Sequence, residues 1–161
     1  MVSGIKGVKE LSFITSHPKD VDFRLFDLMA VKKNIKKCLH LPVQSGSNRI
    51  LGLMNRKYTR ERYLEIAAQY RKKIPEGILA TDVIVGFPTE TEIDFAETIG
   101  LIKQIRFDSA YIFKYSPRPH TKALELGDDV SKEVKQRRHK LLLDLQREIS
   151  RAKAESRASE H

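Results

Sequence analysis

The sequence predicts an α/β fold in which parallel strands alternate with helices. Strand-like apolar segments alternate along the chain with segments whose apolar residues recur at helical spacing. In addition, residues 78–87, ILATDVIVGF, are almost continuously apolar, as expected for a parallel strand that is buried on both faces. We therefore expect about four parallel strands, joined by right-handed crossovers through flanking helices and followed by a C-terminal helix.

The first half of the chain is expected to contain two of these strands. LSFIT, residues 11–15, predicts the first strand, and a helix over residues 21–33 follows it. CLHLPV, residues 38–43, predicts the second strand, and two helical pieces come after it. The second piece begins at Thr59, a favoured N-cap residue, and repeats apolar side chains at helical spacing: Tyr63, Ile66, Ala67, Tyr70 and Ile74.

The second half is expected to contain strands over residues 78–87 and 109–115. Between these strands, Thr91 and Asp94 have the spacing of a capping box that begins a helix. A last helix should begin near Ser131, because apolar residues follow at helical spacing: Val134, Leu141, Leu142, Leu145 and Ile149.

The composition is that of one globular domain, with 40% hydrophobic and 32% charged residues among 161. We place the domain at residues 1–150 and expect residues 151–161, which are polar, to form a frayed or disordered tail. No apolar run approaches the roughly 20 residues that span a membrane, and residues 1–10 lack the apolar core of a signal peptide. We therefore expect a cytoplasmic protein without a membrane association.

The formal net charge of +9 favours a polyanionic partner such as nucleic acid. A basic surface without such a partner explains the charge equally well. The basic residues are spread along the chain, so a disordered basic tail is not the source of the charge.

Side-chain alternation distinguishes the two faces of the predicted sheet. One face of the second and third strands is apolar, with Leu39, Leu41, Val43, Val83, Val85 and Phe87. The opposite face is mixed, with His40, Pro42, Gln44, Asp82, Ile84 and Gly86. This asymmetry favours a segment of a barrel whose interior is open to a ligand, although an open doubly wound sheet with a polar crevice is also compatible.

The loops after the four strands carry hydroxyls, an amide, glycines and cations to one edge of the sheet, where ligands bind in α/β folds. They are TSHP (15–18), PVQSGS (42–47), GFPTET (86–91) and YSPRPHT (115–121).

Asp82 is the most informative residue near this edge, because a carboxylate inside a buried strand requires a partner. Arg56 is a candidate for a structural ion pair with it. Alternatively, Asp82 and Gln44 hold the hydroxyls and amines of a nucleoside-like ligand, and Arg56 clamps the carboxylate of that ligand. Gly86 lets the backbone approach a ligand closely, or it only forms a tight turn before Pro88.

Other catalytic chemistries find no support. The sequence has no HExxH, GxxxxGK[ST], GxSxG or GxGxxG motif. Histidines 17, 40 and 120 lie near strand ends, where we expect hydrogen bonding and not metal ligation. Cys38, the single cysteine, cannot form an internal disulfide or by itself hold an iron–sulfur cluster, and we expect it to be a small core residue.

Three long motifs resemble one family. LHLPVQSGSNRIL..MNRKYTRE, TDVIVGFPTET..DF..T and RFDSAYIFKYSPRP.TKA closely resemble the radical S-adenosylmethionine (SAM) methylthiotransferases. The resemblance is to the MiaB-like branch, which modifies an adenosine beside the tRNA anticodon, and it covers about residues 10–150. It implies strands three to six of a six-stranded, TIM-like radical SAM barrel. It also implies SAM and 4Fe-4S clusters as cofactors, and a reaction in which a radical abstracts hydrogen from an adenine carbon before sulfur is inserted and methylated.

The same resemblance implies roles for individual residues. Gln44, Arg56 and Asp82 match positions that hold SAM in the family, and Gly86 and Tyr115 would line the same cofactor. Three cations would meet tRNA phosphates, although a solvated rim accounts for them equally well: Lys57, Lys114 and Arg118.

Departures from the family pattern qualify these implications. The CxxxCxxC cluster motif and three further family cysteines are absent, and His120 replaces a common glycine. We therefore expect a fragment that depends on an N-terminal cluster-binding segment and a C-terminal RNA-binding domain, and that is inactive alone. A non-enzymatic RNA-binding remnant is one alternative, and an unrelated α/β barrel enzyme using an Asp82–Arg56 pair is another.

Overall fold

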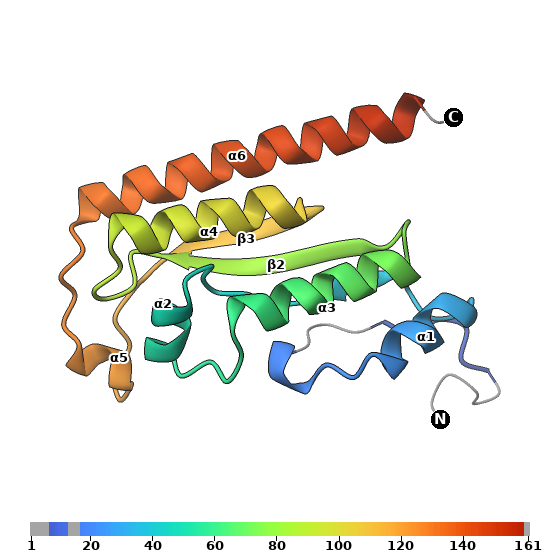
Figure 1. The fold of residues 1–161 in the computed structure, drawn as a ribbon, viewed down its shortest axis with the longest axis horizontal. Helices are drawn as coiled ribbons and strands as arrows, with labels where there is room; N and C mark the ends of the chain where they lie inside the picture. The colour runs from blue at the N-terminus through green and yellow to red at the C-terminus, as the bar shows by residue number, and fades with distance from the viewer. Residues whose placement is uncertain (1–6, 13–16, 160–161) are drawn as a thin grey trace.

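The computed structural model describes residues 7–12 and 17–159. Three parallel strands form a sheet in the order β1 (Cys38–His40), β2 (Ile78–Val85) and β3 (Ser109–Lys114), as Figure 1 shows. The helices are η2 (Pro18–Asp20), α1 (Arg24–Val31), α2 (Asn48–Leu53), α3 (Arg60–Lys73), α4 (Glu92–Ile105), α5 (Lys122–Glu125) and α6 (Lys132–Ser159).

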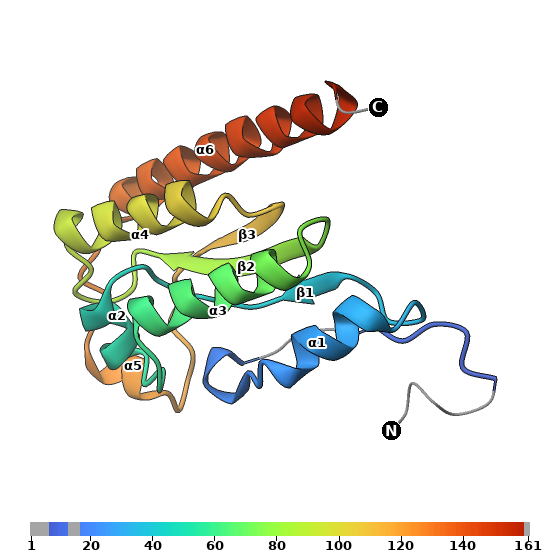
Figure 2. The same cartoon turned by 45° about the vertical axis from the view of Figure 1, so that its right-hand side comes forward.

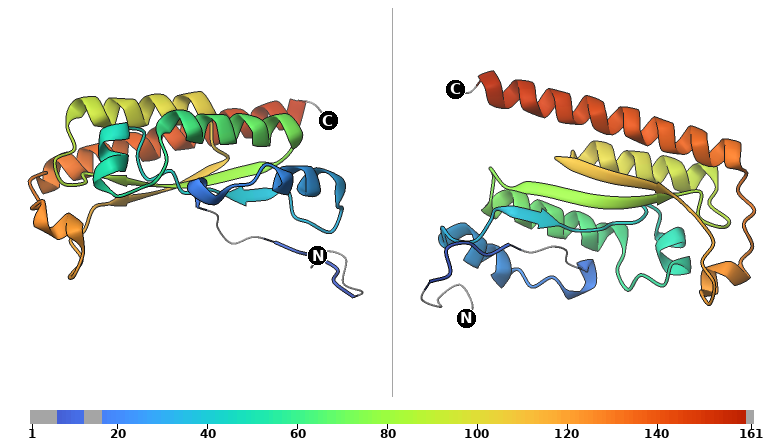
Figure 3. Two further views of the ribbon diagram at one scale, coloured as in Figure 1. Left: turned by 60° about the horizontal axis from the view of Figure 1, so that its bottom comes forward. Right: turned by 180° about the vertical axis from the view of Figure 1, so that it is seen from behind.

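The long helices cover one face of the sheet. Helices α1, α3, α4 and α6 lie side by side in this order, and each contacts the next (Figure 2). Seen edge-on in Figure 3, α3, α4 and α6 all lie on the same side of the strands. A doubly wound sheet carries helices on both faces, so the described residues match the barrel segment and not the open alternative.

Burial confirms the predicted alternation as far as Val85, where β2 ends. Leu39, Leu41, Val43, Val83 and Val85 are all completely buried under the helices. Half-buried side chains of β1 and β2 stand on the opposite face, where the β3 side chains Tyr111 and Phe113 are 57% and 52% exposed. This open face corresponds to the predicted barrel interior.

Strand β1 is shorter than predicted and ends at His40 instead of Val43. The N–H of Val43 donates to the Thr81 hydroxyl at 3.0 Å instead of to a backbone carbonyl, and Pro42 has no N–H to donate. Pairing with β2 resumes at a single bridge between Gln44 and Val83. The chain therefore leaves the ladder where the polar loop begins.

The helix starts follow the predictions. The Thr59 hydroxyl accepts from the Arg62 N–H and caps α3. Thr91 and Asp94 form the complete capping box of α4. Helix α6 follows Ser131, whose hydroxyl accepts from the Val134 N–H at 3.3 Å.

The remaining elements differ in extent. The helix expected over residues 21–33 is limited to α1, with Phe26 and Met29 buried. Most of the expected first strand and part of the TSHP loop fall on residues 13–16, outside the described part, while Leu11 forms a parallel bridge with Ile35. Residues 151–159 continue α6, because they are rich in the helix-forming residues Ala, Lys, Arg and Glu. The division at residue 150 stays a prediction.

Of the helices that the structure describes, none combines the length and apolar character that a membrane span requires.

Candidate functional site

A cavity of about 400 Å³ opens on the face opposite the long helices, at the carboxyl ends of β2 and β3, and the short helix α5 borders it through Ala123. Five residues predicted to bind ligands line it, and they come from three separate loops or strands: Gln44, Asp82, Lys114, Tyr115 and Arg118. Ile84, Phe87 and Phe113 add an apolar wall. The prediction that Phe87 shares the covered face of Val83 and Val85 is therefore wrong, because β2 ends at Val85 and the chain turns at Gly86, whose φ is +68°. A mostly apolar pocket with a few convergent polar groups is the usual form of a small-molecule site.

Gln44 is held in a strained conformation at this cavity. Its φ is +68°, in the left-handed region that a side chain disfavours by about 1–2 kcal/mol. Two backbone hydrogen bonds fix it, from the Gln44 N–H to the Asp82 carbonyl at 2.8 Å and from the Ile84 N–H to the Gln44 carbonyl at 2.9 Å. Strain that the surroundings enforce in this way is typical of binding sites.

The partner of Asp82 is His40, with 2.9 Å between His40 Nε2 and Asp82 Oδ1. The two side chains are about one-quarter exposed and stand on the open faces of neighbouring strands. The predicted pairing of Asp82 with Arg56 is therefore wrong. Arg56 follows α2, and its Nη1 lies 3.4 Å from Nε2 of His17. The prediction that His40 is satisfied by a hydrogen bond is confirmed.

Gly86 shapes the cavity from behind. Its φ is +68°, which disfavours any residue with a side chain. A Cβ at this position would also lie 2.3 Å from Cγ of Lys135 in α6, so the packing excludes a side chain as well. The Gly86 N–H donates to Glu90 Oε2 at 2.7 Å, and Arg138 Nη1 donates to the same oxygen at 2.8 Å. Glu90 is almost completely buried, and this burial raises its pKa.

Asp94 connects the two polar loops that follow β1 and β2. It accepts from the Ser47 hydroxyl at 2.6 Å, from the Thr91 N–H at 2.8 Å and from Arg49 Nη2 at 2.5 Å. Burial acts to raise the pKa of Asp94, but the hydrogen bonds from Arg49, Ser47 and Thr91 outweigh it and hold this pKa well below its usual value.

Close packing of the first polar loop depends on Gly46. The Gly46 N–H donates to the Thr98 hydroxyl at 2.9 Å, and a Cβ on Gly46 would lie 2.5 Å from the Thr98 Cα. The QSGS loop therefore lies directly on helix α4, which fixes the position of Gln44.

Three of the predicted ligand residues do not form the cavity wall. Among the described residues, Gly86 lies behind the wall, Arg56 beside His17, and Lys57 is exposed on the loop after α2. The sequence analysis missed Phe113, although the alternation of Tyr111 and Phe113 along β3, continued by Tyr115 directly after it, indicates that these side chains share one face. For Asp94, the sequence analysis predicted only a role in capping a helix and not its contacts with Ser47 and Arg49.

Comparison with known proteins gives a consistent picture. A sequence profile described as the radical SAM superfamily matches residues 4–102. Curated relatives named tRNA-2-methylthio-N(6)-dimethylallyladenosine synthase include those of Geobacillus kaustophilus (49% identity over 91% of this chain and 28% of the relative) and Thermodesulfovibrio yellowstonii (49% over 94% and 35%). This chain thus spans about a third of the length of these relatives. The solved structure of coproporphyrinogen III oxidase (HemN) from Escherichia coli, a radical SAM enzyme, matches 87% of this chain and 32% of its own with a TM-score of 0.69 at 20% identity. That likeness confirms the predicted fold.

Proposed function

Since this chain belongs to the radical SAM superfamily, we propose that it forms part of the barrel of a tRNA methylthiotransferase and provides walls for SAM and for tRNA. One observation carries the proposal: the cavity on the open face gathers Gln44, Asp82, Lys114, Tyr115 and Arg118. The names and identities of the curated relatives support the same reaction class.

The chemistry of the cavity wall suits the nucleoside part of SAM. Asp82 Oδ1 is occupied by His40, and Oδ2 is the oxygen that would accept hydrogen bonds from ribose hydroxyls. The Gln44 amide would donate or accept beside it, and the aromatic side chains of Phe87, Phe113 and Tyr115 would contact the base. When bound, SAM supplies the radical and the methyl group of such reactions.

Two further residues belong to the proposed cofactor site in other roles. Gly86 lets Lys135 of α6 pack against the loop, which positions the cavity wall. Arg56 is proposed to clamp the carboxylate of SAM, and this role is supported by the family resemblance alone, since Arg56 lies beside His17.

Exposed cations are proposed to meet tRNA. Lys114 and Arg118 lie at the rim of the cavity, and Lys57 is exposed on the loop that follows α2. The net charge of +9 supports a phosphate-rich substrate.

The iron–sulfur cluster that the superfamily implies does not fit the residues of this chain. The sequence contains one cysteine, Cys38, and the described residues contain no group of three His, Cys, Asp or Glu side chains suited to a metal. We therefore assign no radical step to this chain, only binding of SAM and of tRNA. The lone cysteine also favours a reducing, cytoplasmic setting as part of the proposal.

Calorimetry with SAM tests the cofactor site. We expect saturable binding to the chain and a ten- to hundred-fold loss in Asp82→Asn, because a hydrogen bond to a charged group contributes about 1.5–3 kcal/mol. Asp20→Asn is the matched control, since Asp20 is exposed and its one ion pair among the described residues is with its neighbour Lys19. RNA binding without any SAM binding would instead support the RNA-binding remnant.

A further inference from the structure

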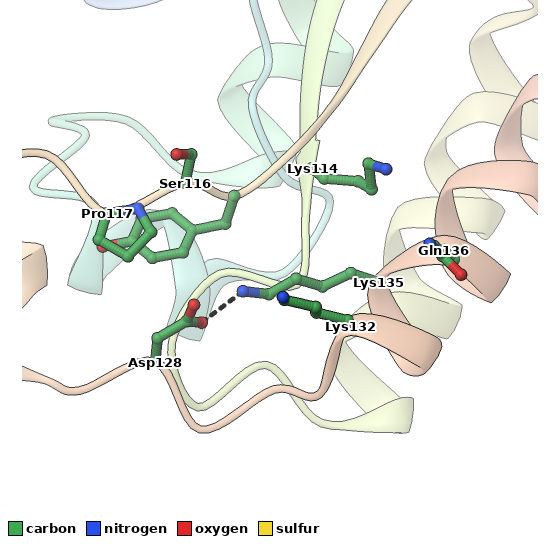
Figure 4. Close-up of a pocket in the computed structure, with 8 residues that line it drawn as sticks. Lys114, Ser116, Pro117, Asp128, Lys132, Lys135 and Gln136 are labelled. Atoms are coloured by element: carbon green, nitrogen blue, oxygen red, sulfur yellow. Dashed lines mark hydrogen bonds and ion pairs between the residues drawn. The ribbon is translucent and has the colours of Figure 1, made fainter.

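A second cavity, of about 310 Å³, lies between the end of β3 and the first turn of α6, as Figure 4 shows. Lys114, Tyr115 and Ser116 line both this cavity and the first one. One short segment of chain therefore separates the two, and a polymer that crosses Ser116 would contact both.

The charge of the second cavity is positive. Lys114, Lys132 and Lys135 line it together with the carboxylate of Asp128, which leaves a surplus of two positive charges. Figure 4 shows Lys132 and Lys135 extending from α6 toward Asp128. Lys135 pairs with Asp128, and its side chain is only 7% exposed. Within residues 7–12 and 17–159, no ion pair involves Lys114 or Lys132, so these two ammonium groups are available to an anion.

The remaining wall suits a nucleotide better than an isolated anion. The Tyr115 ring and Pro117 provide an apolar surface beside the lysines. The Lys135 ammonium lies over the Tyr115 ring, 5.3 Å from its centroid, in a cation–π contact. Single-stranded nucleic acid is commonly bound by such a combination, in which cations follow the phosphates and aromatic rings stack with bases or sugars.

We propose that the second cavity binds one nucleotide of an RNA chain, with its phosphate at Lys114 and Lys132, while a neighbouring nucleoside reaches the first cavity. This inference rests on the proposed function. The wall shared at residues 114–116 favours a polymer over a free nucleotide, because only a polymer would use both cavities at once.

Fluorescence anisotropy with a labelled single-stranded RNA tests the site through Lys132→Gln. We expect about a five-fold loss of affinity at 0.1 M salt, and a slope of log K against log salt that is shallower by about 0.7, the value for one phosphate contact of a single strand. Lys132 is exposed, so the variant should fold. The matched control is Lys103→Gln in the last turn of α4, at the other end of the sheet, where the expected change is less than about two-fold.

Equal losses in the two variants would overturn the inference, since only overall charge would then matter. Calorimetry with AMP distinguishes the source of the phosphate: binding of AMP that depends on Lys132, together with RNA affinity that does not, would assign the cavity to a free nucleotide and overturn the RNA assignment. SAM binding that is intact in both variants would leave the proposed function standing. If the unaltered chain binds neither SAM nor RNA, the proposed function itself is refuted.

Discussion

Arg138→Leu should destabilise the fold strongly, because it leaves a buried carboxylate without its cation. Arg138 Nη1 donates to Glu90 Oε2 at 2.8 Å and to the Glu90 carbonyl at 3.0 Å, and Nη2 donates to Glu92 at 2.7 Å. The Arg138 and Glu90 side chains are only 3% and 1% exposed. Solvent therefore cannot replace the lost guanidinium.

The expected loss in free energy of unfolding is about 3 kcal/mol, at the lower end of the roughly 3–5 kcal/mol for breaking a buried pair. The lower end applies because Glu90 keeps the hydrogen bond from the Gly86 N–H at 2.7 Å. With a urea m-value of about 1–3 kcal/mol/M, the midpoint should fall by at least about 1 M.

Urea unfolding followed by circular dichroism measures this loss, and Arg137→Leu is the matched control on the same helix. Within the part of the chain that the structure describes, Arg137 forms an ion pair with Glu92 alone, and both side chains are more than half exposed, so the loss from Arg137→Leu should be below about 1 kcal/mol. Burial raises the pKa of Glu90, and removal of Arg138 should raise it further. A protonated Glu90 carries no charge, so the loss should be largest above this raised pKa and should shrink as the pH falls through it.

Equal losses in Arg138→Leu and Arg137→Leu would refute the reasoning, as would a loss for Arg138→Leu that does not depend on pH. The double variant Arg138→Leu with Glu90→Gln gives a second check. It should recover part of the stability, because it removes the buried charge together with its partner.

Three further substitutions probe the site's framework. Gly46→Ala should lower the free energy of unfolding by about 1–3 kcal/mol, because its Cβ would lie 2.5 Å from the Thr98 Cα. Asp94→Asn should lower the free energy of unfolding by about 3 kcal/mol at neutral pH. Because the folded protein holds the pKa of Asp94 below its usual value of 3.8, the ionised carboxylate stabilises the fold above pH 3.8. The difference in stability between the variant and the unaltered chain should therefore fade as the pH drops below 3.8. Tyr115→Phe should leave the melting temperature unchanged or raised, because the Tyr115 hydroxyl is buried without a hydrogen-bond partner in the described structure.

For each of these three substitutions, one result would contradict the prediction. Gly52→Ala is the control for Gly46, since its Cβ would meet nothing within 4 Å in α2 and should stabilise the helix by about 0.5–1 kcal/mol. A loss from Asp94→Asn that stays constant below pH 3 would contradict a depressed pKa. A clear fall in melting temperature for Tyr115→Phe would mean that the hydroxyl has a partner, such as a bound water.

Local signals in the sequence were sufficient for the three strands that the structure describes, apart from the early end of β1, and for most helix starts. The alternation of Leu39, Leu41 and Val43 identified the buried face, and the spacing of Thr91 and Asp94 identified a helix start. Such features depend on neighbours within one element. The same local signals also placed Gln44 and Asp82 at one edge of the sheet, because the carboxyl ends of parallel strands lie at the same edge.

Contacts between elements could not be predicted in the same way. The choice of His40 over Arg56 as partner of Asp82 depends on the register between β1 and β2, which composition does not reveal. The same applies to Lys132, which lines one cavity with Lys114 only because α6 returns along β3.

Helix α6 is anchored near both ends of β3. Arg138 engages Glu90 near one end, while at the other Gln146 donates to the Phe107 carbonyl at 3.0 Å and Lys153 pairs with Asp108 at 2.6 Å. One residue inserted between these anchors would rotate everything after it by about 100°, turning the second set away from β3. Homologous chains should therefore keep a constant number of residues here, and gain or lose residues between β3 and α6 instead.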